Sequence, residues 1–147
     1  MIAYCDTEKA LPNEKLMALF RAVGWTTEDG EQTHLHHFNV PFQGSSFVVS
    51  AWDGDMLVGC ARVISDGAVR SVLYDLAVLP QYQGQGIGST LLSRCMKRYP
   101  TTEWIAETTE PCVSFYGKHG FAAAAAGEDC VFMRRSCPLF DSERERL

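Results

Sequence analysis

The chain has 147 residues, of which 46% are hydrophobic, and it carries a formal net charge of −5. This length and apolar content suit one core, so we expect a single domain over residues 1–147, with a loose charged tail at about 141–147. The negative charge argues against nucleic-acid binding, which depends on Lys and Arg neutralising phosphates. It fits a cationic small molecule or peptide as binding partner.

The first predicted element is an amphipathic helix. Apolar residues recur at helical spacing from Leu11 to Val23, with Pro12 near the start and Gly24 just after the last apolar position. Residues 26–46 are polar and irregular, which predicts a loop or a short second helix.

A β-hairpin is predicted next. Residues 47–52 and 56–64 are apolar β-formers, and the Asp-Gly pair within 53–55 is a strong signal for a tight turn between antiparallel strands. Residues 69–79 are rich in β-branched and aromatic side chains and stop at Pro80, so they predict a further strand.

The remaining elements alternate between helix and strand. Helical spacing predicts a helix through 87–96, and β-formers predict a strand at 103–108. A short helix is predicted at 113–119, closed by Gly120. The last two predicted strands are 121–126 and 130–134. The alanine run in the first of these favours helix by propensity, but too few residues lie between the flanking glycines for an ordinary helix. The order predicts an α+β fold with one sheet and flanking helices.

Six cysteines are spread through the predicted core elements. No pair has the C-x-x-C spacing of a structural zinc site, so we expect no metal. Residues 1–9 lack a secretory signal pattern, and no apolar run is long enough to span a membrane. We therefore expect buried, reduced thiols in a cytoplasmic protein that binds neither membrane nor nucleic acid.

The most informative stretch is 75–89, where a strand leads through Gly84, Gly86 and Gly88 into a helix. The first amides of a helix lack intrahelical partners, and glycines let a phosphate approach the backbone closely. The spacing is not the G-x-G-x-x-G of dinucleotide-binding folds, and the Gly-Lys-Ser/Thr of a P-loop is absent. The alternative is a plain tight turn between strand and helix.

Two segments together resemble a known family. The run Gln83-Gly-Gln-Gly-Ile-Gly88 is similar to the Gln/Arg-x-x-Gly-x-Gly/Ala signature of the GCN5-related N-acetyltransferases (GNAT family). The run Ser114-Phe-Tyr-Gly-Lys-His-Gly-Phe121 is similar to the Phe-Tyr-x-x-x-Gly-Phe box of the same family. The resemblance implies a mixed sheet that is splayed at its centre, with acetyl-CoA as cosubstrate bound at the splay of the central strands.

The resemblance also implies cofactor contacts. The pantetheine arm would extend the sheet along the backbone of the strand before the loop, and the pyrophosphate would take the loop amides. The thioester would lie beside the helix that carries Tyr116. The implied cofactor-binding residues are Leu76, Ala77, Val78, Gln83, Gly84, Gln85, Gly86, Ile87, Gly88, Ser89 and Tyr116.

An acceptor amine must lose a proton before it attacks the thioester, and the departing thiolate must gain one. The resemblance implies Tyr116 as the general acid; the alternative is a core aromatic that hydrogen-bonds the loop. Asp75 and Glu107 are candidate bases, directly or through water, and each is equally consistent with a surface or capping carboxylate. A Cys112 nucleophile is a rival without an identified partner histidine, so we expect direct transfer in a ternary complex.

The sequence predicts the binding site of the acceptor amine less well than the cofactor site. The residues that lie where the family's variable region walls the acceptor pocket are Trp25, His34, His36, His37, Phe38 and Phe42. A solvated, histidine-rich loop is the alternative for them.

We expect a small-molecule amine as acceptor. A protein α-amine or lysine is one alternative. A non-catalytic acyl-CoA-binding module is another, because Thr108-Thr-Glu-Pro111 replaces an Asn that many members have there. Members are often dimers, which makes a homodimer the assembly to test.

Overall fold

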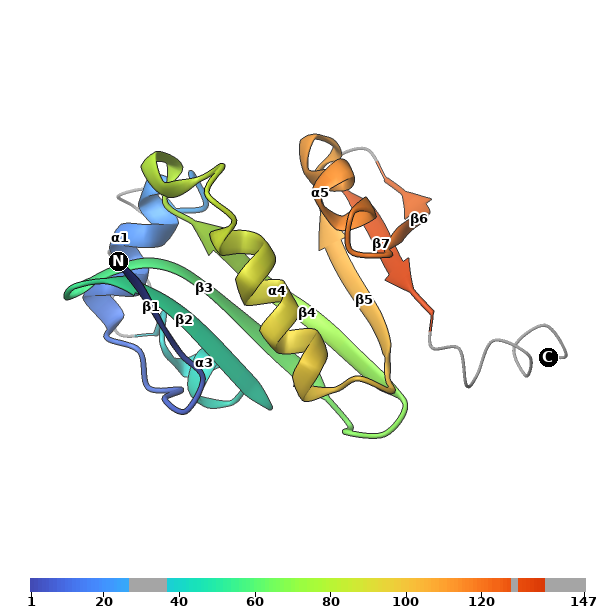
Figure 1. The fold of residues 1–147 in the computed structure, drawn as a ribbon, viewed down its shortest axis with the longest axis horizontal. Helices are drawn as coiled ribbons and strands as arrows, with labels where there is room; N and C mark the ends of the chain where they lie inside the picture. The colour runs from blue at the N-terminus through green and yellow to red at the C-terminus, as the bar shows by residue number, and fades with distance from the viewer. Residues whose placement is uncertain (27–36, 128–129, 137–147) are drawn as a thin grey trace, which may run out of the picture. The chain divides into compact units, whose positions relative to one another are not determined.

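A computed structural model of the protein describes residues 1–26, 37–127 and 130–136. Its strands lie in the order β1-β2-β3-β4-β5-β7-β6. Strands β4 and β5 are parallel, whereas β1–β2, β2–β3, β5–β7 and β6–β7 are antiparallel. The strands are β1 Ile2–Cys5, β2 Phe47–Asp53, β3 Met56–Ser65, β4 Arg70–Val78, β5 Glu103–Thr108, β6 Ala122–Ala126 and β7 Val131–Arg135 (Figure 1). The helices are α1 Asn13–Ala22, α3 Val40–Gln43, α4 Ile87–Arg98 and α5 Val113–Gly117, with 3₁₀ turns η1 Pro80–Tyr82 and η2 Glu110–Cys112. The predicted mixed α+β fold is confirmed.

The chain divides into two compact units. The first contains residues 1–63 and 75–97, and the second contains residues 64–74 and 98–147. Strands β3 and β4 contribute residues to both units, so the expectation of a single domain stays a prediction. No helix within the described ranges is long and apolar enough to cross a membrane.

The predicted hairpin of the first unit is confirmed. Strands β2 and β3 are antiparallel, with Phe47 opposite Val63 and Asp53 opposite Met56. Gly54 has φ 60°, the left-handed conformation that a tight turn between such strands needs. Strand β1 was not predicted; it adds to the edge of the hairpin by pairing antiparallel with β2.

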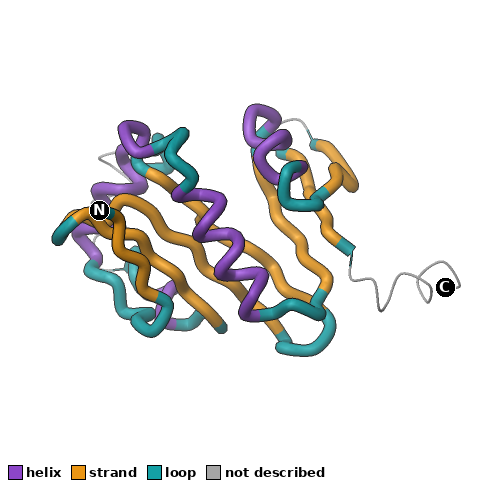
Figure 2. Tube along the Cα trace, in the orientation of Figure 1, coloured by secondary structure: helices purple, strands orange, loops and turns teal. Residues whose placement is uncertain are grey.

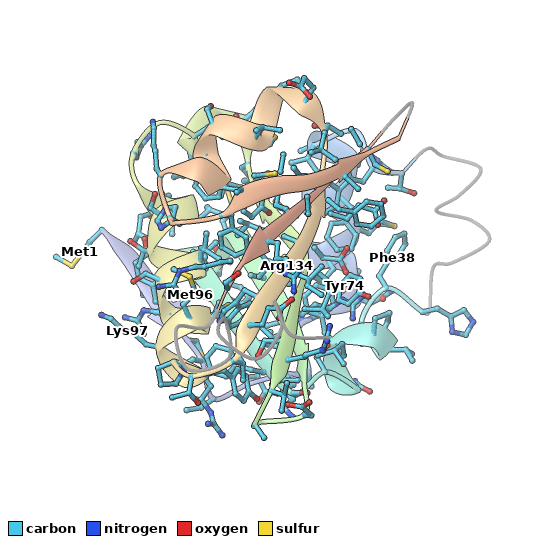
Figure 3. The ribbon with its side chains drawn as sticks, turned by 90° about the vertical axis from the view of Figure 1, so that its right-hand side faces the viewer. Met1, Phe38, Tyr74, Met96, Lys97 and Arg134 are labelled. Carbon is cyan, nitrogen blue, oxygen red and sulfur yellow. The ribbon has the colours of Figure 1, made fainter. Side chains whose placement is uncertain are left out.

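Two helices of the first unit bury the faces that their spacing predicted. In α1 the buried side chains are Leu16, Leu19 and Phe20. Gly24 follows at φ 81°, where its amide donates to the carbonyl of Arg21 and ends the helix. Helix α4 buries the side chains of Ile87, Leu91, Leu92 and Cys95. Met96 is only partly buried and Lys97 is exposed; both are labelled near the end of α4 in Figure 3.

The second unit pairs β5 with β7 and β7 with β6, as Figure 2 shows for the strands in orange. The alanine run is a strand, as predicted, because β7 supplies its hydrogen-bond partners, although every residue of β6 is exposed. The buried carboxylate of Glu103 lies 2.7 Å from the Nε of Arg134. This contact is an ion pair between the two side chains. Such a pair limits the cost of burying the charge.

The prediction of buried thiols needs correction at three cysteines. Cys60 and Cys95 are buried, as expected, but Cys112 is exposed and Cys5 and Cys130 are only partly covered. Cys112 is exposed because it ends a 3₁₀ turn instead of lying in a core element. Cys137 and the tail 141–147 lie outside the described residues.

Candidate active site

Glycines shape the loop between β4 and α4. Gly84 and Gly86 have φ 78° and 84°, a conformation that side-chain-bearing residues rarely adopt. The turn before them is fixed by two contacts: the hydroxyl of Tyr82 donates to Asp53 at 2.6 Å, and the side-chain amide of Gln83 donates to the carbonyl of Val78 at 3.0 Å. Figure 2 shows this loop in teal just before the long helix α4.

The loop presents backbone amides at the start of α4. The first helical bond runs from the amide of Thr90 to the carbonyl of Gly86 at 3.0 Å, and the Thr90 hydroxyl donates to the same oxygen. Within the described residues, the turn and cap hydrogen bonds use no amide from 84–88 as a donor. The first turn of α4 contains no acidic residue. This arrangement favours an anion because unpaired amides and the helix dipole both attract negative charge.

Strand β4 lies between β3 and β5 in the sheet, but its pairing with β5 covers only the first part of the strand. Its residues Arg70 to Leu73 pair in parallel with β5, and the reported register ends at Leu73 opposite Ala106. Further along, the amide of Leu79 donates to the carbonyl of Val58 on β3 at 2.8 Å. Between these points Asp75 has φ 51°, so the strand carries a local break just before Leu76.

Asp75, one candidate base, is paired with a residue that the sequence reasoning missed. The Nε of Arg62 lies 2.5 Å from the carboxylate of Asp75, and the two side chains are 16% and 33% exposed. The available signal was the position of Arg62 inside an apolar strand, where an arginine needs an anionic or aromatic partner. The predicted cofactor-binding residues 76–78 and 83–89 lie in the same unit as this pair.

The second motif lies in the second unit. Tyr116 is 6% exposed, and its ring meets Phe115 and Phe121 edge-on with centroids 5.2 and 5.4 Å away. These contacts fit a core aromatic as well as a buried acid, so the catalytic role stays a prediction. Burial, together with the nearby charges of Arg135 and Lys118, lowers the pKa of His119. This shift favours the neutral form of the imidazole.

The other predicted residues are distributed as follows. Glu107 is exposed on β5, with its backbone opposite Phe132. Phe42, which was expected to line an acceptor pocket, is instead 0% exposed and packs on Phe20 at 6.1 Å. That prediction is wrong because the short helix α3 turns the ring into the core.

The rest of the expected acceptor wall is only partly described. Trp25 is 51% exposed, His37 is exposed and Phe38, labelled in Figure 3, contacts Phe20 at 5.9 Å. His34 and His36 lie outside the described residues. No group of three His, Cys, Asp or Glu side chains in the described chain is placed to hold a metal ion.

Known proteins share both the sequence pattern and the fold. Residues 43–123 match the family described as an acetyltransferase (GNAT) domain. An uncharacterised N-acetyltransferase of the ycf52-like type from Prochlorococcus marinus is 26% identical over 125 residues, which is 80% of this chain and 67% of that protein.

Two solved structures extend the comparison. A GNAT-family acetyltransferase from Streptococcus pneumoniae is 33% identical with a TM-score of 0.65, over 86% of this chain and 95% of that one. The PaiA N-acetyltransferase from Thermoplasma acidophilum, solved in complex with coenzyme A, shares the fold at 20% identity with a TM-score of 0.66, over 92% and 99% of the two chains. With more than half of its length matching the family and the glycine loop in place, the chain belongs to the GNAT family of acetyl-CoA-dependent acetyltransferases.

Proposed function

We propose that the protein transfers the acetyl group of acetyl-CoA to a primary amine of a small molecule, by direct attack in a ternary complex. The observation that carries the proposal is the loop of residues 84–88. Its left-handed glycines and unused amides open α4 without an acidic residue nearby. Such a loop suits the pyrophosphate of coenzyme A, and the PaiA relative was solved with that molecule.

In this proposal the pantetheine arm binds along the backbone of Leu76, Ala77 and Val78 as an added strand. The end of the β4–β5 register at Leu73 supports this, because Leu76, Ala77 and Val78 lie beyond the residues that pair with β5. The amides of residues 84–89 hold the pyrophosphate, and Gln83 braces the turn through its bond to Val78. No part of the binding scheme needs a metal.

The chemical step exchanges one bond for another. The neutral amine nitrogen attacks the thioester carbonyl, a C–N bond forms, and the C–S bond breaks. The amine proton leaves to Asp75 or Glu107, directly or through water, and the thiolate receives a proton from Tyr116. The role of Tyr116 rests on the family resemblance, and the role of Asp75 or Glu107 rests on their positions on the two strands; each residue has its own variant below.

The acceptor class is the finer part of the proposal. The net charge of −5 favours a cationic acceptor, which a free amine is before it loses its proton. A peptide amine satisfies the same charge argument, so the assay includes both acceptor kinds. A small-molecule panel of mono-, di- and aromatic amines is compared with N-terminal and lysine-bearing peptides at equal amine concentration.

The test is release of free CoA thiol from acetyl-CoA with each acceptor. Gly86→Glu is expected to abolish turnover, because it places a carboxylate and a strained backbone at the phosphate position. Tyr116→Phe is expected to lower kcat about 100-fold if the hydroxyl is the acid. Tyr4→Phe is the matched control, since it removes a hydroxyl from β1 and keeps the ring that stacks with Arg94.

Each outcome bears on a separate part of the proposal. Asp75→Asn and Glu107→Gln identify the base: the variant that lowers kcat without changing the affinity for acetyl-CoA marks the residue that takes the proton. Turnover with peptides alone would replace the small-molecule acceptor by a protein one. Binding of acetyl-CoA without turnover of any acceptor would favour the non-catalytic module, and absence of acetyl-CoA binding would refute the proposed cofactor site.

A further inference from the structure

A strained residue interrupts β4 directly before the segment assigned above to the pantetheine arm. Asp75 has φ 51° and is the only non-glycine residue of the described chain with a positive φ. It follows Tyr74, which Figure 3 labels. The left-handed conformation costs free energy in an L-residue because Cβ crowds the following carbonyl, although Asp and Asn tolerate it better than most residues. The surroundings must therefore hold Asp75 in this conformation.

Two neighbouring side chains on β3 hold the carboxylate and the backbone carbonyl of Asp75. The Nε of Arg62 donates to the Asp75 carboxylate at 2.5 Å, and the thiol of Cys60 donates to the Asp75 carbonyl at 3.4 Å. Because side chains alternate along a strand, Cys60 and Arg62 lie on the same face of β3. Burial raises the pKa of the Cys60 thiol, which therefore stays a protonated donor at neutral pH. We call this pair of side chains the β3 clamp.

Arg62 is itself held in place from the other side. Its guanidinium carbon lies 5.9 Å from the centre of the buried Phe42 ring, and its NH1 lies 3.5 Å from the hydroxyl of Ser45. That hydroxyl donates to the carbonyl of Pro41 at 2.6 Å, so the guanidinium is tied to the turn after α3. An arginine anchored in this way loses little further freedom when it pairs with Asp75.

The clamp determines where the next amide points. The peptide bond between Asp75 and Leu76 is trans, and in a planar trans peptide the N–H points opposite to the C=O. The Asp75 carbonyl points at the Cys60 thiol, so the Leu76 N–H points away from it. Leu76 is the first of the residues proposed to bind the pantetheine arm.

We propose that Arg62, assisted by Cys60, is a positioning residue that sets acetyl-CoA affinity by holding Asp75 left-handed, so that the amide of Leu76 faces the cofactor. Asp75 then acts through its backbone and its ion pair, which leaves Glu107 as the candidate base. This inference rests on the proposed function, because it assigns a cause to the affinity of that same site.

The test measures the Kd of acetyl-CoA by calorimetry on the full chain, which needs no acceptor. Asp75→Ala removes the ion pair and disfavours the left-handed backbone, so its Kd is expected to rise about tenfold. Asp75→Asn keeps an acceptor for Arg62 and tolerates a positive φ, so it is expected to restore most of that affinity. Arg62→Met is expected to raise Kd about three- to tenfold, and the double variant Arg62→Met/Asp75→Ala no more than the worse single one.

The control is Arg94→Met, which removes an ion pair with Asp6 in the same unit and leaves Arg62, Cys60 and Asp75 unchanged. It is expected to leave Kd unchanged. Circular dichroism and thermal melting of every variant separate a loss of fold from a loss of affinity.

The results separate this inference from the proposed function. Failure of the wild type to bind acetyl-CoA would overturn both. Wild-type binding with equal Kd in Asp75→Ala, Asp75→Asn and Arg62→Met would overturn the clamp alone. A loss of 100-fold or more in kcat for Asp75→Asn at saturating acetyl-CoA, with Kd kept, would make Asp75 the base and would also overturn it. The clamp is supported if Asp75→Asn binds acetyl-CoA with nearly the wild-type Kd while Asp75→Ala does not, and if the effects of Arg62→Met and Asp75→Ala do not add in the double variant.

Discussion

Gly59 lies on β3 where the strand passes beneath α4, and a single added methyl group there tests the packing under the cofactor loop. A Cβ at Gly59 would lie 3.1 Å from the carbonyl oxygen of Ala77 and 3.1 Å from the Cδ1 of Leu91, with the Cγ2 of Ile87 at 3.4 Å. Carbon atoms in ordinary contact are about 3.5–4.0 Å apart. Both neighbours would therefore have to move by a few tenths of an ångström.

The neighbours of Gly59 leave the added methyl little room to relax. Ala77 contributes backbone of β4, and the Leu91 side chain is 0% exposed in the core. Adding a methylene-sized group to such a core costs about 1–3 kcal/mol. For a chain of this length, a loss of about 2 kcal/mol lowers Tm by roughly 4–8 °C. Because Ile87 begins α4, we also expect a lower affinity for acetyl-CoA.

The assay for Gly59→Ala is thermal unfolding with and without acetyl-CoA. The matched control is Gly44→Ala, since a Cβ there meets nothing closer than 3.6 Å and the residue has φ −82°, which alanine adopts readily. Gly44→Ala is expected to be neutral or to stabilise by about 0.5 kcal/mol. Equal Tm values for the two variants would refute the reasoning, because they would show that α4 and β4 are not packed tightly on Gly59.

Three further variants or probes examine other parts of the structure. Gly86→Ala is expected to weaken acetyl-CoA binding at least tenfold, because alanine resists φ 84°, and calorimetry measures the Kd. With iodoacetamide at pH 8 and mass spectrometry as readout, exposed Cys112 should react first, whereas Cys60 and Cys95 should react only on unfolding, since burial raises the pKa of Cys95 to about 12. The Asp66 carboxylate accepts three amides, which lower its pKa below 3.8 in the fold; its contribution to stability is therefore complete above that pH and lost as pH falls further. Asp66→Ala should abolish this acid-dependent part of Tm, and a wild-type Tm that does not fall between pH 4 and 2 would contradict it.

Sequence patterns predicted most elements because the information for them is local. Helix α4 follows from apolar spacing, and the hairpin follows from an Asp-Gly pair between β-formers. The glycine loop was equally readable, since Gly84 and Gly86 occupy positions that only glycine adopts easily. Strand β1 was missed because four residues carry little alternation and its hydrogen bonds come from β2, more than forty residues away.

The missing parts of the site depend on long-range contacts. The pair of Arg62 and Asp75 joins residues on different strands, so no local spacing predicts it. The left-handed conformation of Asp75 was equally unreadable, because the residue lies inside a run of β-formers. Phe42 was assigned to an acceptor wall because it lies where the variable region of the family walls the acceptor pocket. Its burial is instead set by contacts with Phe20 and Arg62.

The stretch from Asp75 to Gly86 departs from rules that the rest of the first unit obeys. Elsewhere in that unit left-handed residues are glycines in a hairpin or after a helix, as at Gly54 and Gly24, where they let the chain turn. Here a charged residue is left-handed inside a strand, and two glycines expose amides at the start of a helix. Neither feature adds stability. The left-handed Asp75 is strained, and the glycine loop leaves backbone N–H donors without partners in the protein. Features that reduce stability and lie within twelve residues of one another are expected where a ligand compensates for them. The same physical argument therefore supports both proposals: the glycine loop as the pyrophosphate site, and the clamp on Asp75 as a device that sets acetyl-CoA affinity.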